Sequence, residues 1–208
     1  MPQRFQHVIE SQDDLRAVVG TPHAMAVDKA ISEIDEHCAA FIARSPFMLL
    51  ATSATSGRCD VSPKGDAPGF VRVLDKHTLA IPDRPGNRRA DSFSNIVENG
   101  HAGLLFMVPG TDETLRVEGE ANIVADPELL ESLAVDGKAP KLAVVVDVKS
   151  AFLHCAKCIL RADLWDAETW PDRTQVPSAG EMIRAATRID TPAAEIQAGY
   201  DESVKALY

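Results

Sequence analysis

The chain has 208 residues, of which 21 are Lys or Arg and 31 are Asp or Glu, so its formal net charge is −10 at pH 7. This acidic balance argues against a general nucleic-acid binder, because such proteins depend on Lys and Arg contacts to phosphates. Hydrophobic residues make up 45% and charged residues 25%, which is the composition of a folded globular protein and not of a disordered chain.

Nothing in the sequence indicates a membrane protein or an exported one. No segment approaches the roughly 20 apolar residues that span a bilayer, and the first seven residues lack the apolar core of a signal peptide. Four cysteines are too few and too unevenly spaced for a disulfide scaffold. We therefore expect a cytoplasmic protein.

The first half of the chain alternates one amphipathic helix with short apolar segments. Apolar residues recur at helical spacing over residues 27–44, and Pro46 ends the predicted helix. Segments rich in Val, Ile and Leu, separated by Gly, Pro and Asp, predict strands. These segments are 47–53, 71–74, 78–81, 102–108, 115–124 and 143–148. Two short helices are predicted at 90–98 and 127–134, and the strand spacing favours an antiparallel barrel.

Beyond Trp165 the composition shifts to Asp, Pro, Thr and Arg, which predicts a helical tail. Ser178 and Glu181 form a capping-box pattern, and Thr191 is the expected N-cap of a last helix. We expect Trp165 and Trp170 to anchor this tail on the barrel. The predicted organisation is an N-terminal arm at 1–26, a barrel domain at 27–165 and a helical tail at 166–208.

The densest group of polar residues lies between residues 60 and 89. Residues 60–66 read as a polar loop carrying Ser62 and Lys64, and residues 81–89 leave a strand, turn, and place Arg88 and Arg89 just before a helix. Guanidinium groups beside the N–H groups of a helix start suit phosphate oxygens. In the alternative interpretation these arginines and Arg84 are solvated and paired with nearby carboxylates, namely Asp83, Asp91 and Glu98.

Several motifs in this order resemble the flavin-binding split barrels of the pyridoxamine 5′-phosphate oxidase family. They are residues 62–66 (SPKGD), 81–89 (IPDRPGNRR), 95–99 (NIVEN), 115–119 (LRVEG) and 152–157 (FLHCAK). The resemblance covers about residues 31–165 and implies a mainly β fold with flanking helices, an antiparallel FMN-binding split β-barrel. It also implies a homodimer that holds one FMN per subunit at the interface between two barrels.

The same resemblance implies which residues hold the cofactor. The turn that grips the FMN phosphate reads Asn87, Arg88 and Arg89 here, and the strand end that faces the isoalloxazine ring reads Ile81, Pro82 and Asp83. Thr114 falls where the oxidases place a polar residue reaching the flavin, and Ser62 and Lys64 are expected at the cofactor as well. The oxidases' phosphate-binding arginine on the preceding strand falls near Phe70, and Lys64 or Arg72 is expected in its place.

Residues 154–161 carry a second polar group, His154, Lys157 and Arg161, in an otherwise apolar segment. We expect these side chains to line a cleft beside the flavin of the partner subunit, with His154 as the one candidate for proton exchange near neutrality. Alternatively, they are surface residues on a strand edge. No metal site is expected at Cys155 and Cys158, because no second ligand pair accompanies them and a strand would point them to opposite faces.

The sequence therefore predicts an FMN-dependent oxidoreductase that acts on a small molecule, without nucleic-acid or membrane partners. The alternative is a protein of the same fold that binds a flavin, a haem or a pyridoxal compound without catalysis.

Overall fold

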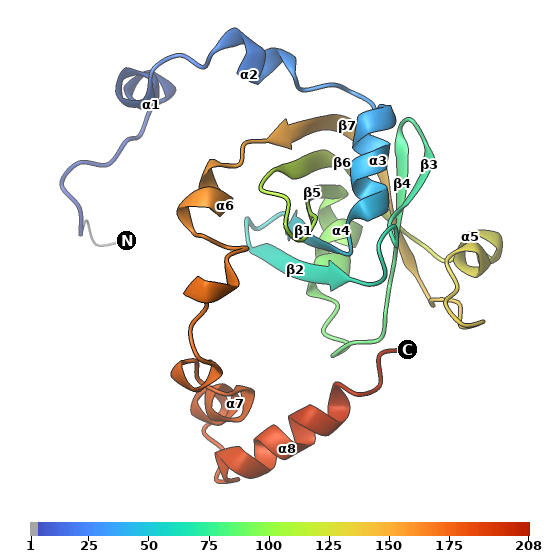
Figure 1. Cartoon of the computed structure of the whole chain (residues 1–208). Coiled ribbons are helices and arrows are strands. Elements are labelled where there is room, and N and C mark those ends of the chain that lie inside the picture. The colour runs from blue at the N-terminus through green and yellow to red at the C-terminus, as the bar shows by residue number, and fades with distance from the viewer. Residues whose placement is uncertain (1–3) are drawn as a thin grey trace.

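The computed structural model describes residues 4–208, so the first three residues of the expected N-terminal arm lie outside the described residues (Figure 1). The elements run α1 Gln12–Val19, α2 Ala24–Asp28, α3 Glu36–Arg44, β1 Phe47–Ser53, β2 Cys59–Gly65, β3 Arg72–Asp75, β4 Thr78–Pro82, α4 Asp91–Asn99, β5 His101–Met107, β6 Thr114–Val124, α5 Pro127–Ser132, β7 Ala143–His154, α6 Lys157–Arg161, η1 Ala167–Thr169, η2 Arg173–Gln175, α7 Ala179–Thr187 and α8 Ala193–Ser203.

Seven strands form one antiparallel sheet in the order β2-β1-β5-β6-β7-β4-β3. The long strands β6 and β7 lie at its centre, and β2 and β3 form the two edges. Alternate residues of β1, β5 and β6 are buried, and they build a core that includes Leu50, Phe106 and Val117. The expected fold class, mainly β with flanking helices and antiparallel, is confirmed.

A β-bulge between Glu118 and Gly119 shifts the register of the central β6–β7 pair by one residue. The backbones approach so closely there that a Cβ atom at position 119 would lie 2.1 Å from the carbonyl oxygen of Asp147. Only glycine fits this approach, and bulges of this kind increase the local twist of a sheet. Gly119 therefore sustains the curvature of the sheet.

Hydrogen bonds along helix α4 hold it against β1 and the residues that directly follow β1. The Asn95 Nδ2 donates to Thr52 Oγ1 at 3.0 Å between two buried side chains, and Asn99 Nδ2 donates to the Ser53 carbonyl at 2.9 Å. Glu98 accepts hydrogen bonds from the backbone and side chain of Thr55. These contacts fix the direction of α4, and with it the place where the helix begins.

The predicted helix over residues 27–44 is wrong in its first half. The chain forms α2, then an extended segment in which Ile31 pairs with Ala151, and α3 begins only after Asp35. The Asp35 carboxylate accepts a hydrogen bond from the Cys38 N–H at 2.7 Å, so this residue is an N-cap and not a helix interior. Between the two helices, Ile31 and Ile34 instead make extended backbone contacts, with Ala151 and Lys76.

The predicted polar loop at residues 60–66 is also wrong, because it is the edge strand β2. Pro63 is compatible with this place, since an edge strand leaves one side of its backbone unpaired. At the other end of the barrel, Cys155 lies between β7 and α6 while Cys158 lies within α6. The argument that a strand points these two cysteines to opposite faces therefore does not apply.

Figure 1 shows α7 and α8 standing away from the sheet, which corrects the expected packing of the tail along the barrel. The two helices pack on each other, with the Gly180 N–H bonded to Gln197 Oε1 at 2.9 Å. The capping box of Ser178 and Glu181 is confirmed. The expected N-cap at Thr191 is wrong, because Pro192 takes that position.

One expected anchor of the tail is present and the other is not. The Trp165 indole N–H donates to the Thr111 carbonyl at 2.9 Å, which joins the start of the tail to the barrel. Trp170 is 59% exposed, and its indole N–H donates to the carbonyl of nearby Leu164.

Over residues 4–208 no helix combines the length and the apolar character needed to cross a bilayer.

Because Gly119 leaves no room for a Cβ atom, we expect Gly119→Ala to lower the free energy of unfolding by about 1–3 kcal/mol or more. Gly103→Ala is the matched control, since a Cβ there would lie 3.9 Å from that of Ala51, an ordinary contact. Urea denaturation of both variants measures the difference. Equal midpoints for the two variants would contradict the close approach at the bulge.

Candidate functional site

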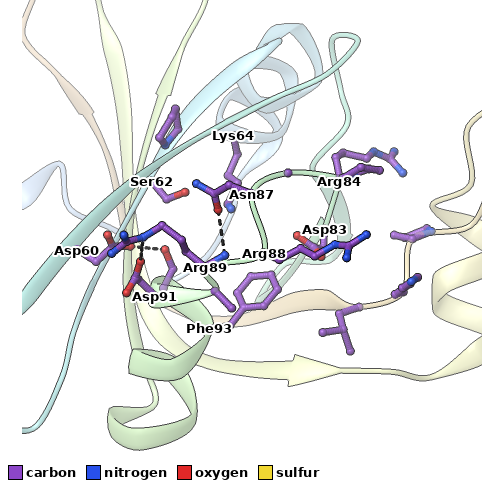
Figure 2. Close-up of a pocket in the computed structure, with 18 of the residues that line it drawn as sticks. Asp60, Ser62, Lys64, Asp83, Arg84, Asn87, Arg88, Arg89, Asp91 and Phe93 are labelled. Atoms are coloured by element: carbon purple, nitrogen blue, oxygen red, sulfur yellow. Dashed lines mark hydrogen bonds and ion pairs between the residues drawn. The ribbon is translucent and has the colours of Figure 1, made fainter. Parts of the chain in front are cut away.

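A cavity of about 830 Å³ lies between the edge strand β2, the start of α4 and the loop that leads into β7 (Figure 2). Three stretches of the chain line it, residues 60–64, 83–93 and 138–142, together with Tyr208. One edge strand of the sheet, the start of a helix and the loop before β7 thus meet at one cavity, which is large enough for a nucleotide-sized ligand.

Strand β2 presents polar side chains to this cavity at every second residue. Asp60, Ser62 and Lys64 are partly buried, whereas the residues between them are exposed. Alternation with a period of two places these three side chains on one face of the strand. This face is polar because it looks onto the cavity rather than onto the apolar core.

The turn before α4 has an unusual backbone. Arg88 and Ala90 have φ angles of 61° and 55°, in the left-handed region that non-glycine residues seldom adopt. Asn87 supports the turn, because its Oδ1 accepts the Arg89 N–H at 3.0 Å. The N-cap of α4 is Ala90, which has no side-chain oxygen to accept the first N–H groups of the helix. These donors are therefore left for a ligand, at the positive end of the helix dipole.

Of the three arginines in the turn, two are held by carboxylates. Arg84 Nε donates to Asp66 Oδ2 at 2.6 Å, with side chains that are 16% and 2% exposed, and Arg89 Nε donates to Asp91 Oδ2 at 2.8 Å. Arg89 is thus exposed and paired with Asp91, as in the alternative interpretation from sequence, whereas Arg84 is nearly buried and pairs with Asp66 instead of Asp83. Within residues 4–208, Arg88 forms no ion pair at 4.0 Å or less.

The carboxylates of the cavity also differ in their surroundings. Asp60 accepts from Ser92 Oγ at 2.5 Å, and the Arg89 guanidinium holds the pKa of Asp91 below its usual value. Burial raises the pKa of Asp83, against the opposing effect of the Lys64 ammonium. The side of the cavity near Lys64 and Arg88 therefore has a net positive character that an anionic group can use.

Apolar surface accompanies these charges. Phe93 is half-buried on the first turn of α4, and the Lys64 ammonium lies 5.5 Å from the centre of its ring. Pro85, Pro140 and Leu142 line the cavity as well. Such a mixture of apolar walls with a few fixed donors suits a ligand that has both a flat ring and an anionic group.

The predicted site residues fall into two groups in space. Those of the first group line the cavity, and they are Ser62, Lys64, Asp83, Asn87, Arg88 and Arg89. Ile81 and Pro82 are buried in β4 directly beneath it, where they pair with β7. Within one subunit the structure does not bring the remaining predicted residues to this cavity.

The second group lies where β6 begins and β7 ends. Thr114 is buried and stands opposite His154 in the β6–β7 register, and Lys157 and Arg161 are exposed on α6. Two further cations, Lys29 and Arg116, lie 5.7 Å and 5.0 Å from the ring centre of Phe152. His154 thus belongs to a cationic cluster separate from the cavity.

The cysteines show no sign of a metal site. No group of three or more His, Cys, Asp or Glu side chains in the described part of the chain could hold a metal ion. Cys155 and Cys158 are exposed free thiols, while burial raises the pKa of Cys38 to about 11. A thiol of that kind stays protonated at neutral pH and behaves as a small apolar side chain.

Sequence reasoning missed several residues of the cavity. Asp60, Ser92 and Phe93 could have been found from the alternation of β2 and from the first turn of α4. Tyr208 has no local signal, because it reaches the cavity from 142 residues beyond Asp66, to which its hydroxyl donates a hydrogen bond. Lys138 and Lys141 lie in a loop whose direction depends on the β4–β7 pairing.

Comparison with known proteins gives one family match and several similar structures. Residues 34–155 match the model of the pyridoxamine 5′-phosphate oxidase family. Comparison with curated protein sequences found no match.

Among solved structures, HupZ from Group A Streptococcus is similar at 18% identity and a TM-score of 0.48, over 58% of this chain and 93% of that one. An FMN-binding protein from Syntrophomonas wolfei is similar at 14% identity and 0.44, over 55% and 81% of the two chains. The heme storage protein HutZ from Vibrio cholerae is similar at 13% and 0.40, over 58% and 93%. At identities this low, the ligand of the present chain must be argued from its own residues.

The buried Asp66–Arg84 pair makes a prediction about pH. Burial alone would raise the pKa of Asp66, but hydrogen bonds from Tyr208, from the Ala67 N–H and from Arg84 hold it below its ordinary value. A lowered pKa stabilises the folded state above the unfolded-state pKa of about 3.9, and this contribution disappears as the pH falls through the folded-state pKa.

We therefore expect Asp66→Asn to cost about 1.5–3 kcal/mol of unfolding free energy at pH 7. The difference from the wild type should begin to shrink below about pH 4, where Asp66 of the unfolded chain takes up a proton, and should vanish once the pH has fallen through the lowered folded-state pKa. Urea denaturation between pH 7 and pH 3 measures it, with exposed Asp13→Asn as the control. A cost independent of pH over this range would show that the carboxylate charge is not what stabilises the pair.

Proposed function

The chain belongs to the pyridoxamine 5′-phosphate oxidase family, and from this premise and the cavity we propose that it is an FMN-dependent oxidoreductase acting on a small organic molecule as a homodimer. The observation that carries the proposal is the start of α4. Its first N–H groups have no capping side chain, and Arg88, without an ion-pair partner within residues 4–208, stands beside them. Together these donors form a phosphate-binding arrangement inside an acidic protein.

The chemistry of the donor set fits FMN. The phosphate would be held by Arg88 and the N–H groups of α4, with Arg89 more weakly involved because Asp91 already binds it. Lys64 and Ser62 on β2 would face the same ligand, and Phe93 and the prolines of the cavity supply apolar walls for a flat ring. When bound, FMN supplies the capacity to accept and release two electrons.

The chain's own contribution is to hold, orient and shield that ligand. Asp83 also lines the cavity, and its backbone N–H donates to the Leu142 carbonyl at 3.0 Å. This bond ties the end of β4 to the loop before β7, so the two cavity walls keep a fixed separation. A fixed cavity supports catalysis because the reacting groups need no further alignment.

The second group of predicted residues, which does not line the cavity, supports the homodimer proposal. Thr114, His154, Lys157 and Arg161 lie outside the cavity of their own subunit, so in this proposal they serve the flavin of the partner. His154 would exchange a proton with the substrate, since an imidazole titrates near neutrality. Lys157 and Arg161 would attract an anionic part of the substrate.

The first test of the phosphate site compares FMN with riboflavin, which lacks the phosphate. We expect FMN to bind much more tightly, and Arg88→Ala to raise its Kd about 10- to 100-fold, because one charge-assisted hydrogen bond contributes about 1.5–3 kcal/mol. Arg89→Ala should have a smaller effect, since its guanidinium is engaged by Asp91. Fluorescence titration of the cofactor-free protein measures all three.

Arg184→Ala, on α7, is the control for loss of one positive charge away from the cavity. Riboflavin binding as tightly as FMN, or an Arg88→Ala variant that binds FMN like the control, would reject the phosphate site. Bleaching of the bound flavin by NADH or NADPH then separates an oxidoreductase from a protein that only stores the cofactor.

Mixed dimers test the sharing of sites between subunits. One subunit carries His154→Ala, and the other carries Arg88→Ala together with Arg89→Ala. If His154 serves the partner's flavin, both lesions fall on one site and up to half of the activity remains. If His154 instead serves the flavin of its own subunit, each of the two sites carries one lesion, and activity should collapse.

The His154→Ala homodimer gives the reference value for this experiment. It should bind FMN normally and react about 10²- to 10⁴-fold more slowly, as expected for loss of a general acid or base. Full activity of that homodimer would rule out a catalytic role for His154. Light scattering at the mass of one chain would rule out the shared site altogether.

A further inference from the structure

The C-terminal end of the chain reaches the cavity through a set of specific contacts at Tyr208. The Tyr208 hydroxyl donates to Asp66 Oδ1 at 2.5 Å, and the Arg84 guanidinium carbon lies 5.8 Å from the centre of the tyrosine ring. The Lys138 ammonium donates to the Tyr208 backbone carbonyl at 3.4 Å. Tyr208 is thus held at three points, two on its side chain and one on its backbone.

The surface that contacts Tyr208 is held together by hydrogen bonds of its own. Asp66 Oδ2 binds Arg84, while Asp66 Oδ1 accepts the Ala67 N–H at 2.7 Å and the tyrosine hydroxyl. Arg84 also donates to the Leu133 carbonyl at 3.1 Å, so its guanidinium plane is fixed from both ends. The pair is nearly buried, which makes its hydrogen bonds and its ring contact stronger than they would be in water.

Tyr208 lies at the far side of the cavity from the start of α4. It lines the same cavity as Arg88 and Phe93, next to Lys138 and Pro140. With 42% of its surface exposed, the ring is partly covered by its contacts and partly open. By contrast, Figure 1 shows α7 and α8, the helices that precede it, standing apart from the sheet.

We propose that Tyr208 is a ligand-contacting wall of the cavity, so that the C-terminal segment holds the flat aromatic part of the ligand and slows its release. Its hydroxyl fixes the ring on the Asp66–Arg84 pair, and the open part of the ring packs against the ligand. This inference rests on the proposed function for the identity of the ligand, FMN, but not for the docking of Tyr208 itself.

The docking is tested first, in protein without cofactor. The sequence contains two tyrosines, Tyr200 and Tyr208, so Tyr200→Phe leaves Tyr208 as the only phenol that titrates. A carboxylate that accepts the phenol hydrogen raises the pKa of Tyr208, and we expect phenolate absorbance to appear above the ordinary value of about 10. Adding Asp66→Asn should return the transition to that value.

The contact with ligand is tested by the dissociation rate of FMN. We expect Tyr208→Ala to raise the dissociation rate and the Kd about 3- to 10-fold, the loss expected for one aromatic contact. Tyr208→Phe keeps the ring but loses the bond to Asp66, so its effect should be smaller. Tyr200→Ala, an aromatic truncation on α8 outside the cavity, is the matched control.

The two measurements separate the possible failures. An ordinary Tyr208 pKa that does not respond to Asp66→Asn overturns the docking and with it the inference. If the Tyr208 pKa is raised but Tyr208→Ala releases FMN at the same rate as Tyr200→Ala, Tyr208 docks without touching the ligand. This result overturns the proposal that Tyr208 is a ligand-contacting wall. Wild-type protein that binds no FMN contradicts the proposed function, while the titration still decides the docking.

Discussion

The placement of the first turn of α4 is the constraint on which the cavity depends. The buried Asn95–Thr52 hydrogen bond and the Asn99–Ser53 contact lock the helix onto β1, and the Asp60–Ser92 bond sets its start against β2. With the helix fixed at these points, its uncapped first turn lines the cavity together with β2 and the loop before β7. The left-handed backbone at Arg88 and Ala90 turns the chain into the first residue of α4. The hydrogen bonds that hold α4 against the sheet offset the free-energy cost of this strained backbone.

The arginines of the turn divide between structural and binding roles, although they are close neighbours in sequence. Arg84 joins a nearly buried pair that ties residues 66, 84 and 133 together, and Arg89 is bound by Asp91 at the mouth of the cavity. Arg88 is left facing the cavity. Internal pairing of Arg84 and Arg89 thus leaves Arg88 as the arginine of this turn that has no ion-pair partner within residues 4–208, next to the uncapped start of α4 where the proposed phosphate would bind.

The sheet and most of its strands follow from the sequence because their inward faces are apolar and continuous. Strand β2 escapes such reasoning, since Asp60, Ser62 and Lys64 face a cavity and look like a loop when read in isolation. The helix predicted over 27–44 fails in its first half for the opposite reason, because partly buried Ile31 and buried Ile34 make long-range backbone contacts, with Ala151 and Lys76, at a spacing that happens to be helical. The family motifs locate the turn around Arg88, but the ion pairs that distinguish its arginines are tertiary and have no local signature.

The hydrogen bond between Tyr208 and Asp66 joins two residues that are 142 positions apart in the sequence. During synthesis the barrel residues emerge first, and domains fold as their residues become available. The sheet, the Asp66–Arg84 pair and the start of α4 can all form before Tyr208 leaves the ribosome. The side of the cavity that Tyr208 lines therefore stays open until this residue has been synthesised, and in the proposed function the cofactor can enter from that side beforehand.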